Sequence, residues 1–183
     1  MPNEDIIIDS AMSFSEAIEG STAPLEIIDS LSMIDVYYHS FDGLRHQGQI
    51  LVDARLEDDI YEIFERIDRL KFPVGKVIPI VSYQWEDGDS MADNNSSAFN
   101  FRVIADTNKL SLHSFGRAVD INPVQNPVIY PTGLIVPTGA VYRPGNNGTF
   151  TTDHPVVSEF LKRGWHWGGN FEQPKDYHHF EKT

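Results

Sequence analysis

The chain has 183 residues, of which 40% are hydrophobic and 22% charged, a balance typical of one globular domain. Its 27 acidic against 14 basic residues give a formal net charge of −13, which disfavours a nucleic-acid partner because an acidic surface repels phosphate. There is no cysteine, which excludes disulfides, thiolate chemistry and zinc sites built on cysteine.

No apolar run approaches membrane-spanning length, so we expect no transmembrane segment. Residues 1–5 are acidic and lack the basic and apolar regions of a secretory signal peptide. Residues 1–32 are mixed in character, with a potential short helix at 10–20 and a break at Pro24. We interpret them as an N-terminal arm that packs on a single domain formed by residues 33–183.

The clearest periodic patterns follow this arm. Residues 33–40 are rich in β-branched and aromatic side chains, and a second apolar run at 49–52 follows an Asp-Gly pair, which predicts a β-hairpin. Residues 56–71 predict a helix that Pro73 brings to an end. Its apolar stripe consists of Ile60, Ile63, Phe64, Ile67 and Leu70.

The middle of the chain is less regular. Residues 77–83 predict a strand that Pro79 restricts to an edge or a bulge. Residues 86–89 indicate an acidic turn and residues 91–97 a polar loop. Residues 98–104 alternate in polarity and predict another strand.

Residues 122–148 contain several prolines and glycines and predict a long irregular loop, of the kind that often walls a binding cleft. A short helix is expected at residues 155–163, capped by the polar residues 151–153 and ended by Gly164. Together the elements predict a single α+β domain with a mainly antiparallel sheet and flanking helices.

Two clusters of histidines and carboxylates carry the chemistry. His113 and Asp120 lie on either side of Gly116, which lets a loop histidine and a strand aspartate approach each other. Residues 176–181 form a second cluster, Asp-Tyr-His-His-Phe-Glu. A catalytic zinc site needs three protein ligands and an open position, with a carboxylate nearby as base. Spacing alone fits either such a site or ordinary His–Asp hydrogen bonds.

The second cluster leaves its zinc ligand open. On an extended strand, Asp176 and His178 share one face and His179 opposes them. On a helical turn, Asp176 instead pairs with His179. Periodicity does not choose between the two histidines.

Residues 111–120 match the pattern S-x-H-x-x-G-x-A-x-D, and residues 176–179 match acid-x-x-His. These patterns resemble the two signatures of the D-alanyl-D-alanine carboxypeptidase metallopeptidases, a group that includes phage L-alanyl-D-glutamate endolysins. Residues 94–102, 122–127 and 164–169 look like the carboxypeptidase-like branch of that group.

The resemblance implies zinc as cofactor, His113, Asp120 and His179 as its ligands, and Asp176 as the general base that takes a proton from water. His178 falls at a variable position. The resemblance also implies a hedgehog/D-Ala-D-Ala-peptidase-like fold. Family members of the vancomycin-resistance type carry Glu where this chain has Asp176, whereas the endolysin-like branch accepts Asp.

Three further residues are candidates. Arg102 corresponds to an arginine near the substrate carbonyl in the family, where a guanidinium stabilises an oxyanion; the alternative is a structural ion pair. Ser111 and Trp167 are candidates for substrate binding, with turn capping and core packing as their alternatives.

We therefore expect a zinc-dependent peptidase that hydrolyses a D-Ala-D-Ala or L-Ala-D-Glu bond in peptidoglycan stem peptides. The alternatives are a broader dipeptidase or amidase with the same metal centre, and a non-catalytic, zinc-stabilised binding module for cell wall or protein. The compartment stays open: periplasm or cell wall if a leader has been removed, otherwise cytoplasm or a phage-lysin-like location.

Overall fold

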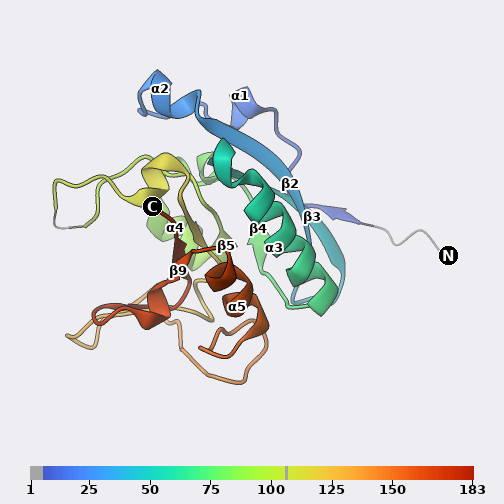
Figure 1. Ribbon diagram of the computed structural model, residues 1–183, viewed down its shortest axis with the longest axis vertical. Helices are drawn as coiled ribbons and strands as arrows, with labels where there is room; N and C mark the ends of the chain where they lie inside the picture. Colours follow the sequence, from blue (N-terminus) through green and yellow to red (C-terminus); the bar gives the residue numbers. More distant parts are fainter. Residues whose placement is uncertain (1–5, 106) are drawn as a thin grey trace.

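The N-terminal half is built on a long β-hairpin. In the computed structural model, which describes residues 6–105 and 107–183, β2 (Leu31–His39) pairs antiparallel with β3 (Arg45–Asp53) along their whole length (Figure 1). The predicted hairpin is confirmed. Both strands extend beyond the apolar runs that indicated them, because main-chain pairing continues through their polar ends.

A single amphipathic helix covers this hairpin. The short 3-10 turn η1 (Ala54–Leu56) leads from β3 into α3 (Glu57–Leu70), which confirms the predicted helix. Its apolar stripe packs on the hairpin and is at most 1% exposed at Ile60, Ile63, Phe64 and Ile67. Leu70, also expected in the stripe, is 37% exposed at the end of the helix.

Residues 6–30 fold back onto the hairpin. β1 (Ile7–Ile8) pairs in parallel with β3, and α1 (Phe14–Ala17) and α2 (Leu25–Ile28) follow. A second apolar cluster anchors these residues, formed by Ala17, Ile28, Leu31, Leu51 and Phe99. The boundary at residue 32 falls just inside β2, and the division of the chain into arm and domain stays a prediction.

Residues 76–104 differ most from expectation. β4 (Lys76–Val77) is short because the chain turns at Pro79 into the 3-10 helix η2 (Ile80–Tyr83), and it pairs in parallel with β5 (Asn95–Ser96). The helix α4 (Asp87–Ala92) replaces the predicted acidic turn.

The strand predicted at residues 98–104 is wrong. This segment is irregular apart from an isolated bridge between Val103 and Leu110. Its main chain bonds instead to the loop that carries His113, through Asn100 N to His113 O at 3.1 Å and Ser111 N to Arg102 O at 3.0 Å.

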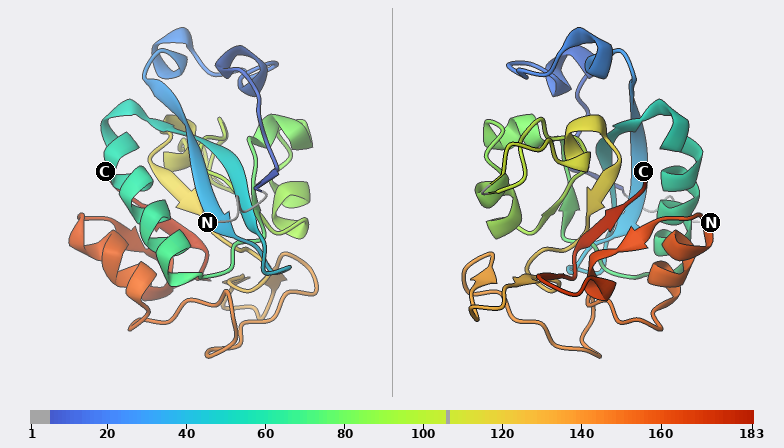
Figure 2. Two further views of the ribbon diagram at one scale, coloured as in Figure 1. Left: turned by 90° about the vertical axis from the view of Figure 1, so that its right-hand side faces the viewer. Right: turned by 60° about the vertical axis from the view of Figure 1, so that its left-hand side comes forward.

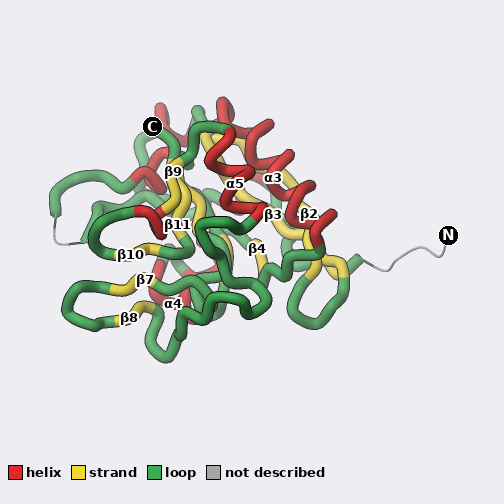
Figure 3. Tube along the Cα trace, turned by 60° about the horizontal axis from the view of Figure 1, so that its bottom comes forward, coloured by secondary structure: helices red, strands yellow, loops and turns green. Residues whose placement is uncertain are grey.

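The C-terminal half consists of short strands joined by long loops. β6 (Ala118–Asp120), β9 (His166–Trp167) and β11 (His179–Glu181) form one sheet with β11 in the centre. A second sheet contains β7 (Val128–Ile129), β8 (Ile135–Val136) and β10 (Lys175–Asp176). The predicted irregular loop at residues 122–148 is confirmed, with the small β7–β8 hairpin inside it (Figure 3).

The helix α5 (Pro155–Lys162) confirms the remaining helix prediction and lies beside α3 (Figure 2). An ion pair of 2.5 Å between Arg163 and Glu62 connects the two helices. The predicted cap at residues 151–153 is wrong, because His154 is the capping residue: its Nδ1 accepts from Val156 N at 3.2 Å. Gly164 follows with a positive φ of 79°, as a residue that ends a helix often does.

The molecule is thus a single α+β domain, as predicted, but its strands form several small sheets instead of one. Within the described residues there are three sheets of three strands and one of two, and most pairings are antiparallel. The hedgehog/D-Ala-D-Ala-peptidase-like topology stays a prediction. Across residues 6–105 and 107–183, no helix combines the length and the apolar character needed to cross a membrane.

Candidate metal centre

His113 lies on a 3-10 helix, η3 (Leu112–Phe115), that leads into strand β6. Ser111 caps this helix, and Gly116 ends it with a φ of 65°. Gly116 also packs tightly, since a Cβ atom there would lie 2.5 Å from the main-chain nitrogen of Asp53. The glycine therefore permits both the turn and the close contact with β3 that places His113 beside β6.

Asp120 and His179 are cross-strand neighbours. They lie opposite each other in the antiparallel pair of β6 and β11, so their side chains share one face of the sheet. The main chain of Asp120 is further held by Ser97, with N–O distances of 2.8 and 3.0 Å in the two directions.

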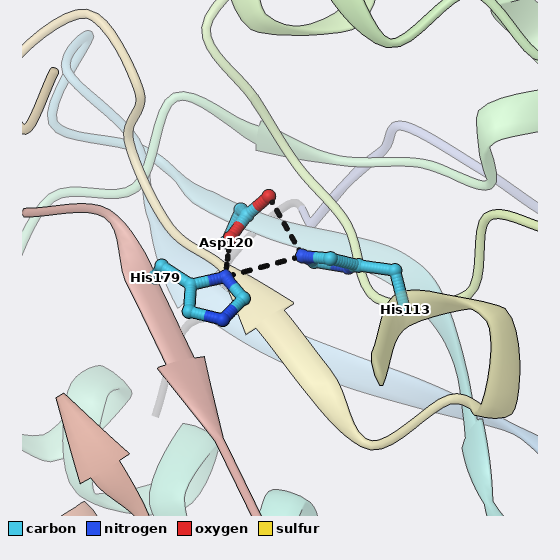
Figure 4. Close-up of side chains that lie close together, drawn as sticks. All are labelled: His113, Asp120 and His179. Atoms are coloured by element: carbon cyan, nitrogen blue, oxygen red, sulfur yellow. Dashed lines mark hydrogen bonds and ion pairs between the residues drawn. The ribbon is translucent and has the colours of Figure 1, made fainter. Parts of the chain in front are cut away.

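Three potential ligand atoms converge at this point (Figure 4). His113 Nε2 lies 3.2 Å from His179 Nδ1 and 3.1 Å from Asp120 Oδ2. His179 Nδ1 lies 2.9 Å from Asp120 Oδ1. The side chains of His113 and Asp120 are 3% and 6% exposed, and that of His179 is 12% exposed. The centre is nearly buried and opens on the His179 side.

The other ring nitrogens have partners that orient the two imidazoles. His113 Nδ1 lies 2.6 Å from the carbonyl oxygen of Ala98, which can only accept, so Nδ1 carries the proton. Nε2 then directs its lone pair at the centre. His179 Nε2 lies 3.1 Å from Glu181 Oε2, an arrangement typical of histidines that bind metal.

The charges and hydrogen bonds around this centre favour a bound proton. Burial alone would raise the pKa of Asp120, but the neighbouring His113 and His178 and the hydrogen bonds of the ring nitrogens hold it well below its usual range. Burial alone would lower the pKa of His179, but hydrogen bonds to Asp120 and Glu181 raise it to about 10. A metal ion would compete with this proton, so metal binding would release it.

The donor set fits zinc. Two imidazole nitrogens and one carboxylate are ligands that zinc accepts, and they leave a fourth position for water or substrate. Bonds of about 2.0–2.2 Å in a tetrahedron separate ligand atoms by roughly 3.3–3.6 Å. The observed separations of 2.9 to 3.2 Å are only slightly shorter.

The remaining members of the second cluster lie beside this centre. Asp176 ends strand β10, and its side chain is 21% exposed. His178 is buried, and its Nε2 lies 3.1 Å from Asp176 Oδ1 and 3.9 Å from Asp120 Oδ2. The pairing of Asp176 with His179 that a helical turn would give is not observed: Asp176 contacts His178, while His179 joins His113 and Asp120.

A family model described as D-alanyl-D-alanine carboxypeptidase matches residues 105–182. This segment contains His113, Asp120, Asp176 and His179. The match covers less than half of the chain, so the likeness to this peptidase family is that of the C-terminal part. No curated protein and no solved structure gives a significant match. The resemblance predicted from the two motifs is confirmed, and it carries a metal-competent His-Asp-His group with it.

Arg102 lies outside the segment that matches the peptidase family. Its guanidinium pairs with Asp87 at 3.0 Å, which is the alternative considered for it. Its side chain remains 31% exposed, and its Nε is buried without a hydrogen-bond partner in the described residues. Asp87 was missed because it sits in the stretch expected to be a simple turn.

The structure agrees with the alternatives considered for Ser111 and Trp167, which were turn capping and core packing. Ser111 is buried, and its hydroxyl accepts from the amide of His113 at 3.3 Å. Trp167 is 2% exposed, and its indole donates to the carbonyl of Tyr177 at 2.9 Å. Both side chains therefore support the site from behind and offer a substrate little surface.

Sequence reasoning missed the groups that orient the site from other segments. The carbonyl oxygen of Ala98 orients His113, and that of Asn126 lies 2.8 Å from His178 Nδ1. Main-chain acceptors leave no residue signature, so no pattern could have identified them. Glu181, by contrast, lies within the second cluster of the sequence, and a carboxylate is a usual partner for a histidine that binds metal.

Proposed function

We propose that the protein is a zinc-dependent peptidase that hydrolyses a peptide bond in peptidoglycan stem peptides. The observation that carries the proposal is the convergence of His113, Asp120 and His179 from the two family motifs. The substrate class follows from the family, whose named member is a D-alanyl-D-alanine carboxypeptidase. The bond is D-Ala-D-Ala or L-Ala-D-Glu.

In this proposal His113, Asp120 and His179 hold zinc, which when bound polarises the scissile carbonyl and lowers the pKa of water. The carboxylate of Asp176 accepts the proton of the attacking water and transfers it to the leaving amine. Water thereby adds across the C–N bond, giving a carboxylic acid and an amine. Asp176 suits this role because it is partly exposed beside a nearly buried centre.

Arg102 is assigned a secondary role. Its ion pair with Asp87 supports a structural contribution, and its exposed fraction leaves room for contact with a substrate oxygen or carboxylate. Arg102→Ala is therefore expected to raise KM or lower kcat less than removal of Asp176. Arg102→Lys tests whether the flat guanidinium matters beyond its charge.

The test uses the full chain, stripped with a chelator and reloaded with zinc. Wild type should release D-alanine or new amino groups from purified peptidoglycan, as measured by amine labelling and mass spectrometry of defined muropeptides. Asp120→Ala should lose zinc and activity, by more than the roughly 10–100-fold in affinity that loss of an outer partner costs. Asp176→Ala should keep zinc and lose activity. Asp153→Ala, at an exposed carboxylate, serves as the matched control.

Two outcomes would contradict the proposal. Release of amines that persists in Asp176→Ala would remove the base from the mechanism. Zinc binding that raises the thermal midpoint without any amine release would favour the non-catalytic binding module. The ion pair between Arg102 and Asp87 is the observation that favours the binding module as a second candidate. It engages an arginine that was expected to contact substrate.

A further inference from the structure

His178 is a buried side chain that the proposed mechanism does not use. It lies in the turn between β10 and β11, and its side chain is 3% exposed. Its Nδ1 lies 2.8 Å from the carbonyl oxygen of Asn126. Because a carbonyl only accepts, Nδ1 carries a proton and donates it. The ring is thereby fixed in one orientation, with Nε2 on the opposite side.

That second nitrogen faces the proposed proton acceptor. His178 Nε2 lies at an ion-pair distance of 3.1 Å from Asp176 Oδ1, a buried oxygen that has no hydrogen-bond partner in the described residues. This close contact links the fixed imidazole to the proposed proton acceptor.

The main chain that accepts from His178 is held in place by further hydrogen bonds. The side chain of Asn126 is fully buried and bonds to two segments of the chain, at residues 121–122 and 148–150. Its Nδ2 donates to Gly148 O at 2.8 Å and to Asn122 O at 3.2 Å, and its Oδ1 accepts from Phe150 N at 2.7 Å. The long irregular loop thus provides a fixed acceptor against which the imidazole is held.

Asp176 and His178 differ in how much of each side chain a substrate could reach. Asp176 is 21% exposed, although its Oδ1 is buried, so the accessible part of the side chain lies away from His178. His178 itself offers a substrate almost no surface. We propose that His178 is a positioning residue, which fixes the carboxylate of Asp176 beside the metal centre through the 3.1 Å contact of its Nε2, while its Nδ1 is anchored on the main chain of Asn126. This inference rests on the proposed function, in which Asp176 is the proton acceptor.

The first test does not depend on activity. The ring nitrogens of His178 are followed by nitrogen-15 NMR in the zinc-loaded wild type and in Asp176→Ala, whose partly exposed position makes it the variant more tolerant of change. The Nε2 signal should shift in Asp176→Ala while the Nδ1 signal stays in place. An Nε2 signal that is identical in both proteins would overturn the proposal, whether or not the protein proves to be a peptidase.

The second test is a double-mutant cycle on muropeptide hydrolysis. His178→Phe should lower kcat by about 10–100-fold, with KM and zinc affinity within about twofold of wild type. His178→Gln, which retains a donor, should recover part of the loss. In an Asp176→Asn background, His178→Phe should cost no further activity, because it acts through a group already removed.

An equal loss in both backgrounds, or a loss of zinc affinity that matches the loss of kcat, would overturn the positioning role. A wild type without hydrolysis would instead contradict the proposed function, and the NMR comparison would still decide the contact. If His178→Phe fails to fold, as judged by circular dichroism, the cycle is run with His178→Gln, which should then show a smaller loss in the same direction.

Discussion

The two halves of the chain are held together by different interactions. In the N-terminal half, β2, β3 and α3 bury an apolar stripe and an apolar sheet face, and β2 pairs with β3 along their whole length. In the C-terminal half, buried polar side chains bond to irregular main chain, as Asn122 does with Pro73 O at 2.7 Å and Gly75 N at 2.9 Å. Regular packing supplies a platform, and polar contacts hold the loops that form the site.

This difference shows which kind of contact fixes the orientation of side chains at the site. Apolar packing is not directional, so it tolerates small shifts. Hydrogen bonds to a fixed carbonyl define the orientation of a ring, as the bond from His113 to Ala98 illustrates. The site depends on the second kind of contact, and four substitutions separate the two.

The largest loss of stability is expected from the N-terminal half. Ile63 on α3 is fully buried, and Ile63→Ala should lower the free energy of unfolding by about 2–5 kcal/mol, because it leaves a cavity. Urea denaturation followed by circular dichroism measures it. Tyr61→Ala, on the exposed side of the same helix, should cost far less. Equal losses of unfolding free energy in the two variants would mean that burial of the apolar stripe does not stabilise the fold.

The matching change in the C-terminal half is Asn126→Ala. It leaves Phe150 N buried without its partner and removes one of two donors to Gly148 O, which should cost about 1–3 kcal/mol. Hydrogen exchange should rise at residues 122–150 before it rises in α3. Asn146→Ala, at an exposed position of the same loop, is the control. Unchanged protection at residues 122–150 would show that apolar packing also holds this loop.

The same contrast explains what the sequence could predict. Alternation and helical spacing are local signals, so β2, β3 and α3 were predictable, although β3 extends beyond the apolar run that indicated it. The resemblance to the two family signatures indicated His113, Asp120 and His179 as ligands, whereas spacing alone left the choice between His178 and His179 open. The structure adds that their ligand atoms lie within 4.8 Å of one another.

Other features arise from contacts between distant residues, which leave no local pattern. The strand expected at residues 98–104 failed because its main chain pairs with the loop that carries His113. Asn126 resembles an ordinary turn residue in a stretch rich in proline and glycine. Asp176 and His178 are connected by a turn between two strands, which periodicity could not distinguish from a continuous strand.

A smaller effect, on activity more than stability, is expected at Gly168. A Cβ atom there would lie 2.3 Å from the carbonyl oxygen of Asp176 and 2.9 Å from its Cβ. Gly168→Ala should therefore displace Asp176 and lower kcat on the order of 10–100-fold, with zinc affinity retained. Steady-state hydrolysis and zinc titration measure the two effects. Gly88→Ala is the control, since its added Cβ would meet no atom within 4 Å.

The smallest effect concerns an ion pair at the junction of the halves. Hydrogen bonds from Arg55 and Arg117 hold the pKa of the buried Asp53 below its usual range, against the opposing effect of burial. A depressed carboxyl pKa stabilises the fold at pH values above the unfolded pKa of about 3.9, and this stability is lost as pH falls toward the folded value.

Asp53→Asn should therefore reduce stability near pH 7 by about 1 kcal/mol, because the exposed Arg55 is screened by solvent. The difference from wild type should shrink as pH drops from about 5 to 3, a window set by the carboxyl pKa values. Urea midpoints at each pH, with Asp153→Asn as an exposed control, measure it. A difference that stays constant with pH would assign the role of Asp53 to shape rather than charge. In that case packing would stabilise the junction, as it does the N-terminal half. Directed polar contacts, which hold the C-terminal half, would not be the main contribution there.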